Sequence, residues 1–147
     1  MKMLVKKLSP DAILPTYGTS GAAAADLYAL CPPQGITIAP MQRVVIPTGI
    51  AIELPSADYV ALVHIRSGHG LKYGLALSNG VGVIDSDYRG ELQMGIVNLS
   101  QQAYTVQNGE RIAQLRIAPA LQPQFEEVEE LSDTVRGVQG FGSTGKK

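Results

Sequence analysis

Residues 79–92 read Asn79-Gly80-Val81-Gly82-Val83-Ile84-Asp85-Ser86-Asp87-Tyr88-Arg89-Gly90-Glu91-Leu92. Asn-Gly before small and β-branched residues predicts a tight hairpin turn that leads into a strand. Gly82 within that strand would let another group approach the backbone closely. If the extended conformation continues, Asp85 and Asp87 place their carboxylates on one face. The same residues are typical of an Asx-stabilised surface turn, so both interpretations stay open at this point.

Composition limits the class of protein. The 147 residues predict one domain with its own hydrophobic core. The net charge of −1 gives no reason to expect a nucleic-acid partner, although a small anion needs only a local basic cluster. No apolar run is long enough to cross a membrane. The single cysteine, Cys31, has no internal disulfide partner and the chain opens without a charged and apolar leader, so we predict a cytoplasmic protein.

Glycine and proline residues divide the chain into short segments. Sixteen glycines and nine prolines interrupt short apolar runs, which predicts an all-β sandwich of many short strands. The expected strands lie at 3–5, 22–30, 36–38, 44–46, 50–54, 59–65, 75–77, 81–84, 92–98, 104–106 and 111–117. The alanine-rich run 22–30 has helical propensity. We still predict a strand there, because Gly21 and Pro32 bound the run and strand patterns surround it. Asn108-Gly109 predicts a second hairpin turn.

Three separated segments carry groups that suit a polyphosphate. Guanidinium forks, hydroxyls and backbone N–H groups freed by glycine are what such a ligand needs from a protein. These segments are Arg66-Ser67-Gly68, Arg111 with Gln114, and a tail that holds Arg136, Ser143 and Thr144. We therefore expect them to meet at one anion.

Asp26 is a carboxylate between apolar neighbours, and such a group usually caps a turn or meets a cation. Magnesium on a triphosphate is one candidate cation, since it keeps several waters and takes only one or two protein carboxylates. His64 and His69 lack the spacing of metal ligands with other candidates. We therefore assign neither histidine to a metal.

The end of the chain has a different composition. Residues 125–131 carry four glutamates, which predicts a solvated edge that resists pairing. Residues 136–147 are mostly glycine, polar and basic, so we expect a flexible arm after a domain of residues 1–135. Residues 140–147 come close to a P-loop sequence. They lack its final Ser or Thr and a following helix, so that motif is rejected.

Five stretches, taken in order, resemble the motifs of the trimeric deoxyuridine triphosphate nucleotidohydrolases, the dUTPases. They are residues 22–27, 66–68, 79–92, 109–115 and 136–145. The resemblance implies a jelly-roll-like β-sandwich or barrel, and a homotrimer with three active sites at subunit boundaries. It implies Mg²⁺-dependent hydrolysis of dUTP to dUMP and pyrophosphate, with no nucleic-acid or membrane partner. Such an enzyme limits uracil incorporation into DNA and supplies dUMP for thymidylate synthesis.

The resemblance also implies a role for individual residues. Asp85 would be the general base that activates water for attack on the α-phosphorus. Uracil would bind Asn79, Gly82, Val83, Ile84 and Gln93, and Tyr88 would press against the deoxyribose. The phosphates would bind Arg66, Ser67, Gly68 and Gln114, while Asp26 would contact Mg²⁺ through a metal-bound water. The arm of another subunit would close over the site, with Phe141 stacked on uracil and with Arg136, Gly142, Ser143 and Thr144 at the phosphates.

The chain departs from the family pattern at several positions. Ala24 and Gln139 stand where glycine is usual, and Ile65 replaces a common proline. His69-Gly70 replaces a commoner apolar pair. None of these departures removes a predicted contact group.

Two alternatives remain. One is an enzyme of the same fold that resembles dCTP deaminase, which would need an acid–base carboxylate at the cytosine amino group. The other is a jelly roll that binds nucleotides without turnover, and the presence of Asp85 argues against it.

Overall fold

Strands dominate the computed structural model, which describes residues 1–138 and 140. The strands are β1 (Leu4–Lys7), β2 (Ala25–Tyr28), β3 (Ile36–Ile38), β4 (Arg43–Pro47), β5 (Ile50–Glu53), β6 (Tyr59–Ile65), β7 (Leu75–Leu77), β8 (Gly82–Ile84), β9 (Gln93–Asn98), β10 (Tyr104–Val106) and β11 (Arg111–Pro119). The described part of the chain has one helix, α1 (Ser67–Tyr73). The prediction of an all-β fold is confirmed.

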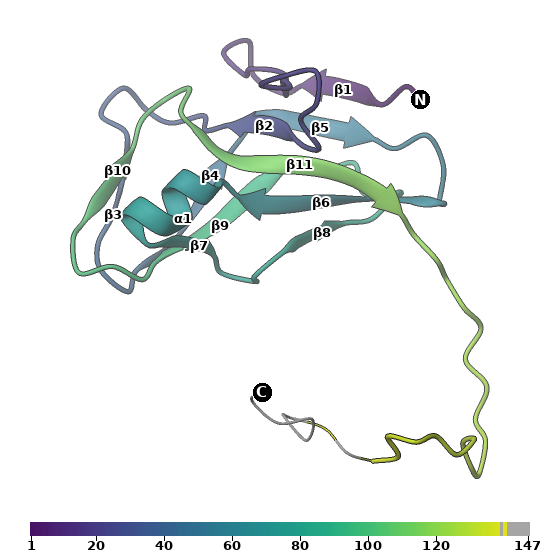
Figure 1. The fold of residues 1–147 in the computed structure, drawn as a ribbon. Coiled ribbons are helices and arrows are strands. Elements are labelled where there is room, and N and C mark those ends of the chain that lie inside the picture. Colours follow the sequence, from purple (N-terminus) through teal and green to yellow (C-terminus); the bar gives the residue numbers. More distant parts are fainter. Residues whose placement is uncertain (139, 141–147) are drawn as a thin grey trace.

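The strands pair antiparallel in an order that differs from their order along the chain. The largest sheet has the order β2-β11-β6-β8, and a second has the order β4-β9-β7 (Figure 1). The pairs β1-β5 and β10-β3 complete the described pairing. Such crossovers between strands are typical of Greek-key and jelly-roll sandwiches.

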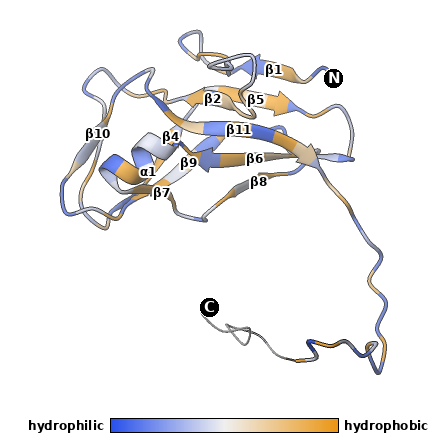
Figure 2. Ribbon diagram, in the orientation of Figure 1, coloured by the Kyte–Doolittle hydropathy of each residue, from blue (hydrophilic) through white to orange (hydrophobic). Residues whose placement is uncertain are grey.

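The core is built from the inward-facing residues of these strands. β9 alternates in burial, with Met94, Ile96 and Asn98 turned inward. On β5, Ile50 and Ile52 are buried, and Figure 2 shows hydrophobic colour along this strand. Hydrophilic colour marks part of β11, which carries three polar side chains among buried neighbours. Each fully buried isoleucine contributes about 1.5–3 kcal/mol of hydrophobic stabilisation.

Only residues 25–28 of the alanine-rich run 22–30 form the predicted strand. β2 pairs with β11, so its backbone hydrogen bonds go to a neighbour in the sheet and not along a helix. Ala25 and Leu27 are buried in this pairing. Tertiary pairing therefore overrides the helical propensity of the alanines.

Both Asn-Gly turns form, but neither closes a hairpin. Gly80 and Gly109 have φ values of 75° and 74°, the left-handed conformation that a tight turn requires. Yet β7 pairs with β9 while β8 pairs with β6, so the first turn carries the chain from one sheet to another. The second turn also carries the chain from one sheet to another, because β10 pairs with β3 and β11 pairs with β2. The hairpin predictions are wrong for this reason.

Helix α1 was not predicted, because its short sequence contains two glycines of low helical propensity. It begins after Arg66, whose extended backbone ends β6, and it stops at Gly74, whose φ of 66° is the left-handed helix stop. The Gly74 N–H satisfies carbonyls at the end of the helix. His69 is its buried residue, so α1 packs through a histidine.

The expectation that Gly82 lets another group approach the backbone closely is confirmed. A Cβ placed on Gly82 would lie 3.0 Å from the Cβ of Val63, its partner on β6, so Val63 is one such group. The expectation for residues 125–131 needs correction. Residues 125–131 are exposed as predicted but form no strand, so they are not a sheet edge.

The segment after β11 leaves the sheets and runs away from them (Figure 1). Residues 121–138 are exposed throughout. No helix in the described part of the chain is long and apolar enough to cross a membrane.

Candidate active site

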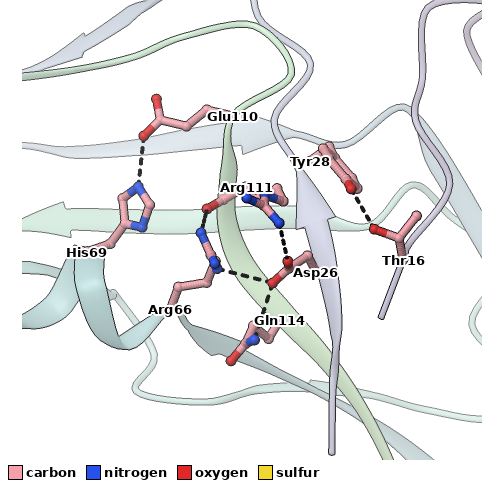
Figure 3. Close-up of polar contacts among 8 residues, drawn as sticks. All are labelled: Thr16, Asp26, Tyr28, Arg66, His69, Glu110, Arg111 and Gln114. Atoms are coloured by element: carbon pink, nitrogen blue, oxygen red, sulfur yellow. Dashed lines mark hydrogen bonds and ion pairs between the residues drawn. The ribbon is translucent and has the colours of Figure 1, made fainter. Parts of the chain in front are cut away.

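A buried carboxylate on β2 binds three polar side chains. Asp26 is 3% exposed. Its Oδ1 forms an ion pair with Arg66 Nε at 3.1 Å and accepts a hydrogen bond from Gln114 Nε2 at 3.2 Å, and its Oδ2 accepts one from an Arg111 guanidinium nitrogen at 3.2 Å (Figure 3). We call Asp26, Arg66, Arg111 and Gln114 the Asp26 cluster. One buried negative charge thus holds two cations in fixed places.

Backbone pairing aligns the members of the cluster. Asp26 lies directly opposite Gln114 in the β2–β11 ladder. Arg66 follows β6, and its N–H donates to Ile112 O at 3.1 Å. Its guanidinium also donates to Arg111 O at 3.0 Å. The arginines remain partly open to solvent, since their side chains are 31% and 48% exposed. The cluster can therefore present positive charge to an anion.

The resemblance assigned Asp26, Arg66 and Gln114 to metal and phosphates, and the structure brings these three together. Ser67 and Gly68 follow as the first exposed residues of α1. Arg111 was expected beside Gln114 at an anion, but its contact with Asp26 was not predicted. Its place on the cluster follows from the β2–β11 register, which the sequence does not specify.

A small pocket lies between β8 and β9. It has a volume of about 90 Å³. Its lining includes Asn79, Gly82, Val83, Ile84 and Gln93, the five residues that the resemblance assigned to uracil. Pockets for drug-sized ligands measure roughly 300–1,000 Å³, so this one has room for little more than a single small ring.

Asp85 follows β8 in an exposed turn and not in a continued strand. The Tyr88 N–H donates to Asp85 O at 3.2 Å, which closes a turn over residues 85–88. Of the two interpretations left open for this stretch, the surface turn is therefore confirmed, and Asp85 and Asp87 do not share the face of a strand. Both aspartates line a second hollow of about 490 Å³. Tyr88 O–H donates to Glu91 O at 3.0 Å, which fixes its ring beside this turn.

Within one chain, Asp85 is far from the Asp26 cluster. Asp26 faces Gln114, which faces His64, while Asp85 follows Ile84, whose partner lies three residues before His64 on β6. Asp26 and Asp85 are thus separated by roughly 14 Å across three strand spacings and roughly 10 Å or more along the strands. A base must lie within hydrogen-bond reach of the water it activates. The two groups of one chain therefore do not face the same phosphates.

The arm residues are only partly described. Arg136 is exposed. Phe141, Gly142, Ser143, Thr144 and the departure at Gln139 lie outside the described residues.

The side chains that could bind a metal ion limit the kind of metal site this chain can form. In residues 1–138 and 140, no three His, Cys, Asp or Glu side chains are grouped to hold an ion. Both oxygens of Asp26 already accept hydrogen bonds. A lone carboxylate fits a Mg²⁺ ion that arrives on phosphate oxygens and keeps its waters, and it does not fit a metal caged by protein ligands.

Comparisons with known proteins agree with this geometry. A family model described as dUTPase matches residues 10–145. The chain is 50% identical, over 147 residues and the full length of both proteins, to a deoxyuridine 5'-triphosphate nucleotidohydrolase of Hydrogenobaculum sp. (strain Y04AAS1). The structure matches a Staphylococcus bacteriophage 80alpha dUTPase with dUPNHPP at a TM-score of 0.88 and 30% identity, over 98% of each chain.

A mutant dUTPase from phage phi11 of S. aureus matches at a TM-score of 0.80 and 25% identity, over 90% of this chain and 100% of that one. Its structure is described as revealing the coordination of a structural Mg(II) ion. The fold of the present chain is therefore the β jelly roll of these enzymes. The chain belongs to the dUTPase family and is a dUTP diphosphatase, an enzyme that hydrolyses dUTP.

Proposed function

We propose that the enzyme cleaves dUTP to dUMP and pyrophosphate by attack of water on the α-phosphorus, with Asp85 as the general base. The observation that carries this assignment is the exposed carboxylate of Asp85, directly after the strand that lines the small pocket. An ordinary aspartate is ionised at neutral pH. An ionised carboxylate is able to accept a proton from water.

Uracil occupies the pocket between β8 and β9 in this proposal. β8 is the last strand of its sheet, so its outer edge offers backbone N–H and C=O groups to a ligand. These groups, with Asn79, pair with the directional donors and acceptors of uracil and reject cytosine. The small pocket volume excludes the extra methyl group of thymine. Tyr88 lies against the deoxyribose, where a 2′-hydroxyl would clash.

The phosphates bind Arg66, Ser67, Gly68 and Gln114. Arg66 is held by Asp26 through its Nε, which leaves part of its guanidinium for phosphate oxygens. Arg111 adds a second cation to this surface. Bound Mg²⁺ would neutralise charge on the triphosphate, and Asp26 would contact it through a metal-bound water.

A homotrimer with shared active sites accounts for the distance within one chain. The Asp26 cluster of one subunit would then meet the pocket and Asp85 of a neighbour. The arm would close over this site from another subunit, with Arg136 and Phe141 among its contact residues. The product dUMP would feed thymidylate synthesis, and removal of dUTP would limit uracil incorporation into DNA.

The substitution Asp85→Asn tests the base directly. We expect the variant to bind dUTP with Mg²⁺ as the native enzyme does and to hydrolyse it about a thousandfold or more slowly. Calorimetric affinity and pyrophosphate release measure the two effects separately. Unchanged turnover would remove Asp85 from the role of base.

A panel of dUTP, dCTP, dTTP and UTP, each with Mg²⁺, tests the pocket. We expect pyrophosphate from dUTP alone. Ammonia released from dCTP would contradict the proposed chemistry and would identify a deaminase.

A further inference from the structure

We propose that His69 and Glu110 form a positioning pair, which fixes Arg66 and Arg111 for the triphosphate. This inference rests on the proposed function of the Asp26 cluster as a phosphate-binding surface. Neither His69 nor Glu110 was assigned to the site above, and neither needs to touch substrate. They act through the two arginines.

The pair is a buried, charge-assisted hydrogen bond. His69 is 7% exposed, and its Nε2 lies 2.7 Å from Glu110 Oε1. Tyr104 O–H donates to the same oxygen, and the Gln107 N–H donates to Oε2 at 2.8 Å. Glu110 therefore accepts three hydrogen bonds, which fix both its oxygens.

These contacts determine the protonation of the pair. Burial alone would raise the pKa of Glu110, but the hydrogen bonds from Tyr104, Gln107 and His69 bring that pKa below its ordinary value. The carboxylate is thus ionised at neutral pH and acts only as an acceptor. We therefore place a hydrogen on His69 Nε2. His69 Nδ1 is buried and has no hydrogen-bond partner in the described part of the chain.

His69 and Glu110 are each connected to one of the two arginines. The backbone N–H of His69 donates to Arg66 O at 3.0 Å, so the imidazole extends from the same helical turn as Arg66. Glu110 directly precedes Arg111, whose carbonyl accepts a hydrogen bond from the Arg66 guanidinium. The His69–Glu110 bond thus joins α1 to β11 beside the Arg66–Arg111 contact (Figure 3). The two bonds together oppose sliding of α1 relative to β11.

Two tyrosine rings pack against the imidazole. The ring centroids of Tyr73 and Tyr104 lie 5.8 and 5.9 Å from that of His69, and 4.6 Å from each other. These contacts and the hydrogen bond to Glu110 together hold His69 in one place.

The test compares His69→Leu, which keeps the packing, with His69→Gln, which restores an N–H donor. Lys72→Ala, at an exposed position of the same helix, is the matched control. Two measurements are made on full-length protein with Mg²⁺: the kinetics of dUTP hydrolysis, and calorimetric affinity for inorganic tripolyphosphate. Thermal unfolding of each variant verifies that it is folded.

We expect His69→Leu to raise KM and to weaken tripolyphosphate binding, each by about five- to tenfold, with kcat within about twofold. His69→Gln should recover at least half of each loss on a logarithmic scale. Glu110→Gln should weaken tripolyphosphate binding less in the His69→Leu background than in the native enzyme, because the His69–Glu110 bond is already gone there. Lys72→Ala should behave as the native enzyme.

Unchanged tripolyphosphate affinity in His69→Leu would overturn the inference, and so would a His69→Gln variant no better than His69→Leu. If His69→Leu does not fold, Glu110→Gln alone decides, and native affinity in that variant would overturn the inference. A native enzyme that does not hydrolyse dUTP would refute the proposed function. The tripolyphosphate measurements would still decide the inference in that case.

Discussion

Asp26 and Gln114 lie directly opposite each other on β2 and β11, and the Gln114 amide donates to the Asp26 carboxylate over 3.2 Å. The same carboxylate holds two arginines. It is the single negative charge in the Asp26 cluster, so the two cations depend on it for their positions.

Asp26→Asn removes that charge and leaves two guanidinium groups close together. Removing one partner of a buried ion pair costs about 3–5 kcal/mol, and the partial exposure of both arginines reduces the expected loss to about 2 kcal/mol. Urea unfolding measures the change. Asp11→Asn, at an exposed position, is the control and should stay within about 0.5 kcal/mol of the native protein. Equal stabilities of the two variants would show that Asp26 does not hold the cluster.

Gly90→Ala should disturb Tyr88 and so weaken selection of the sugar. A Cβ on Gly90 would lie 2.6 Å from Cζ of the Tyr88 ring, and the backbone there does not need glycine for a left-handed conformation. The ring must therefore move. We expect discrimination between dUTP and UTP, as the ratio of kcat/KM values, to fall about tenfold. Gly18→Ala, where a Cβ meets nothing within 4 Å, should keep the native ratio. A native ratio in Gly90→Ala would argue against Tyr88 as the sugar contact.

The lowered pKa of Glu110 predicts the pH range in which it stabilises the fold. Since the folded-state pKa lies below the ordinary value of 4.5, the ionised group contributes stability above about that pH. The contribution is lost as pH falls through the lowered pKa. The difference in urea midpoint between the native protein and Glu110→Gln should therefore be largest near pH 7 and shrink below pH 4.5. Glu127→Gln, on the exposed segment, should show no such trend. A constant difference between pH 7 and pH 3 would contradict the assignment.

Deletion of residues 136–147 should separate folding from activity. Among the residues that the structure describes, those buried in the core all precede this segment, and those after 120 are exposed. We expect the melting temperature to change by less than about 2 °C, while dUTP turnover falls at least about tenfold. An unfolded truncation product would make the arm a structural element.

Much of the strand pattern could be predicted from the sequence. The run Tyr59–Ile65 forms β6 with the predicted bounds, because an apolar run between turn signals has few alternatives. Sheet membership was not predictable from local signals. The turn at Asn79-Gly80 suits a hairpin, yet long-range pairing sends β7 and β8 to different partners. Helix α1 was missed because its glycines oppose it and its stability comes from a buried histidine and a terminal glycine.

Some contacts of the candidate site could be predicted from the sequence and others could not. The five uracil residues line one pocket because they lie close together in sequence or on paired strands. The contact of Arg111 with Asp26 and the His69–Glu110 pair were missed for a different reason. Their contacts join residues 85 and 41 positions apart, and no local pattern signals them.

The central claim is that each active site combines Asp85 of one subunit with the Asp26 cluster of another. Mixed trimers test it most directly: Asp85→Asn and Arg66→Ala chains, each inactive alone, are unfolded together, refolded in equal amounts and assayed with dUTP. If the sites are shared, about one quarter of them contain both native residues, and about a quarter of the native activity returns. If both residues served the same site within one chain, no mixture would regain activity, and that result would contradict the account.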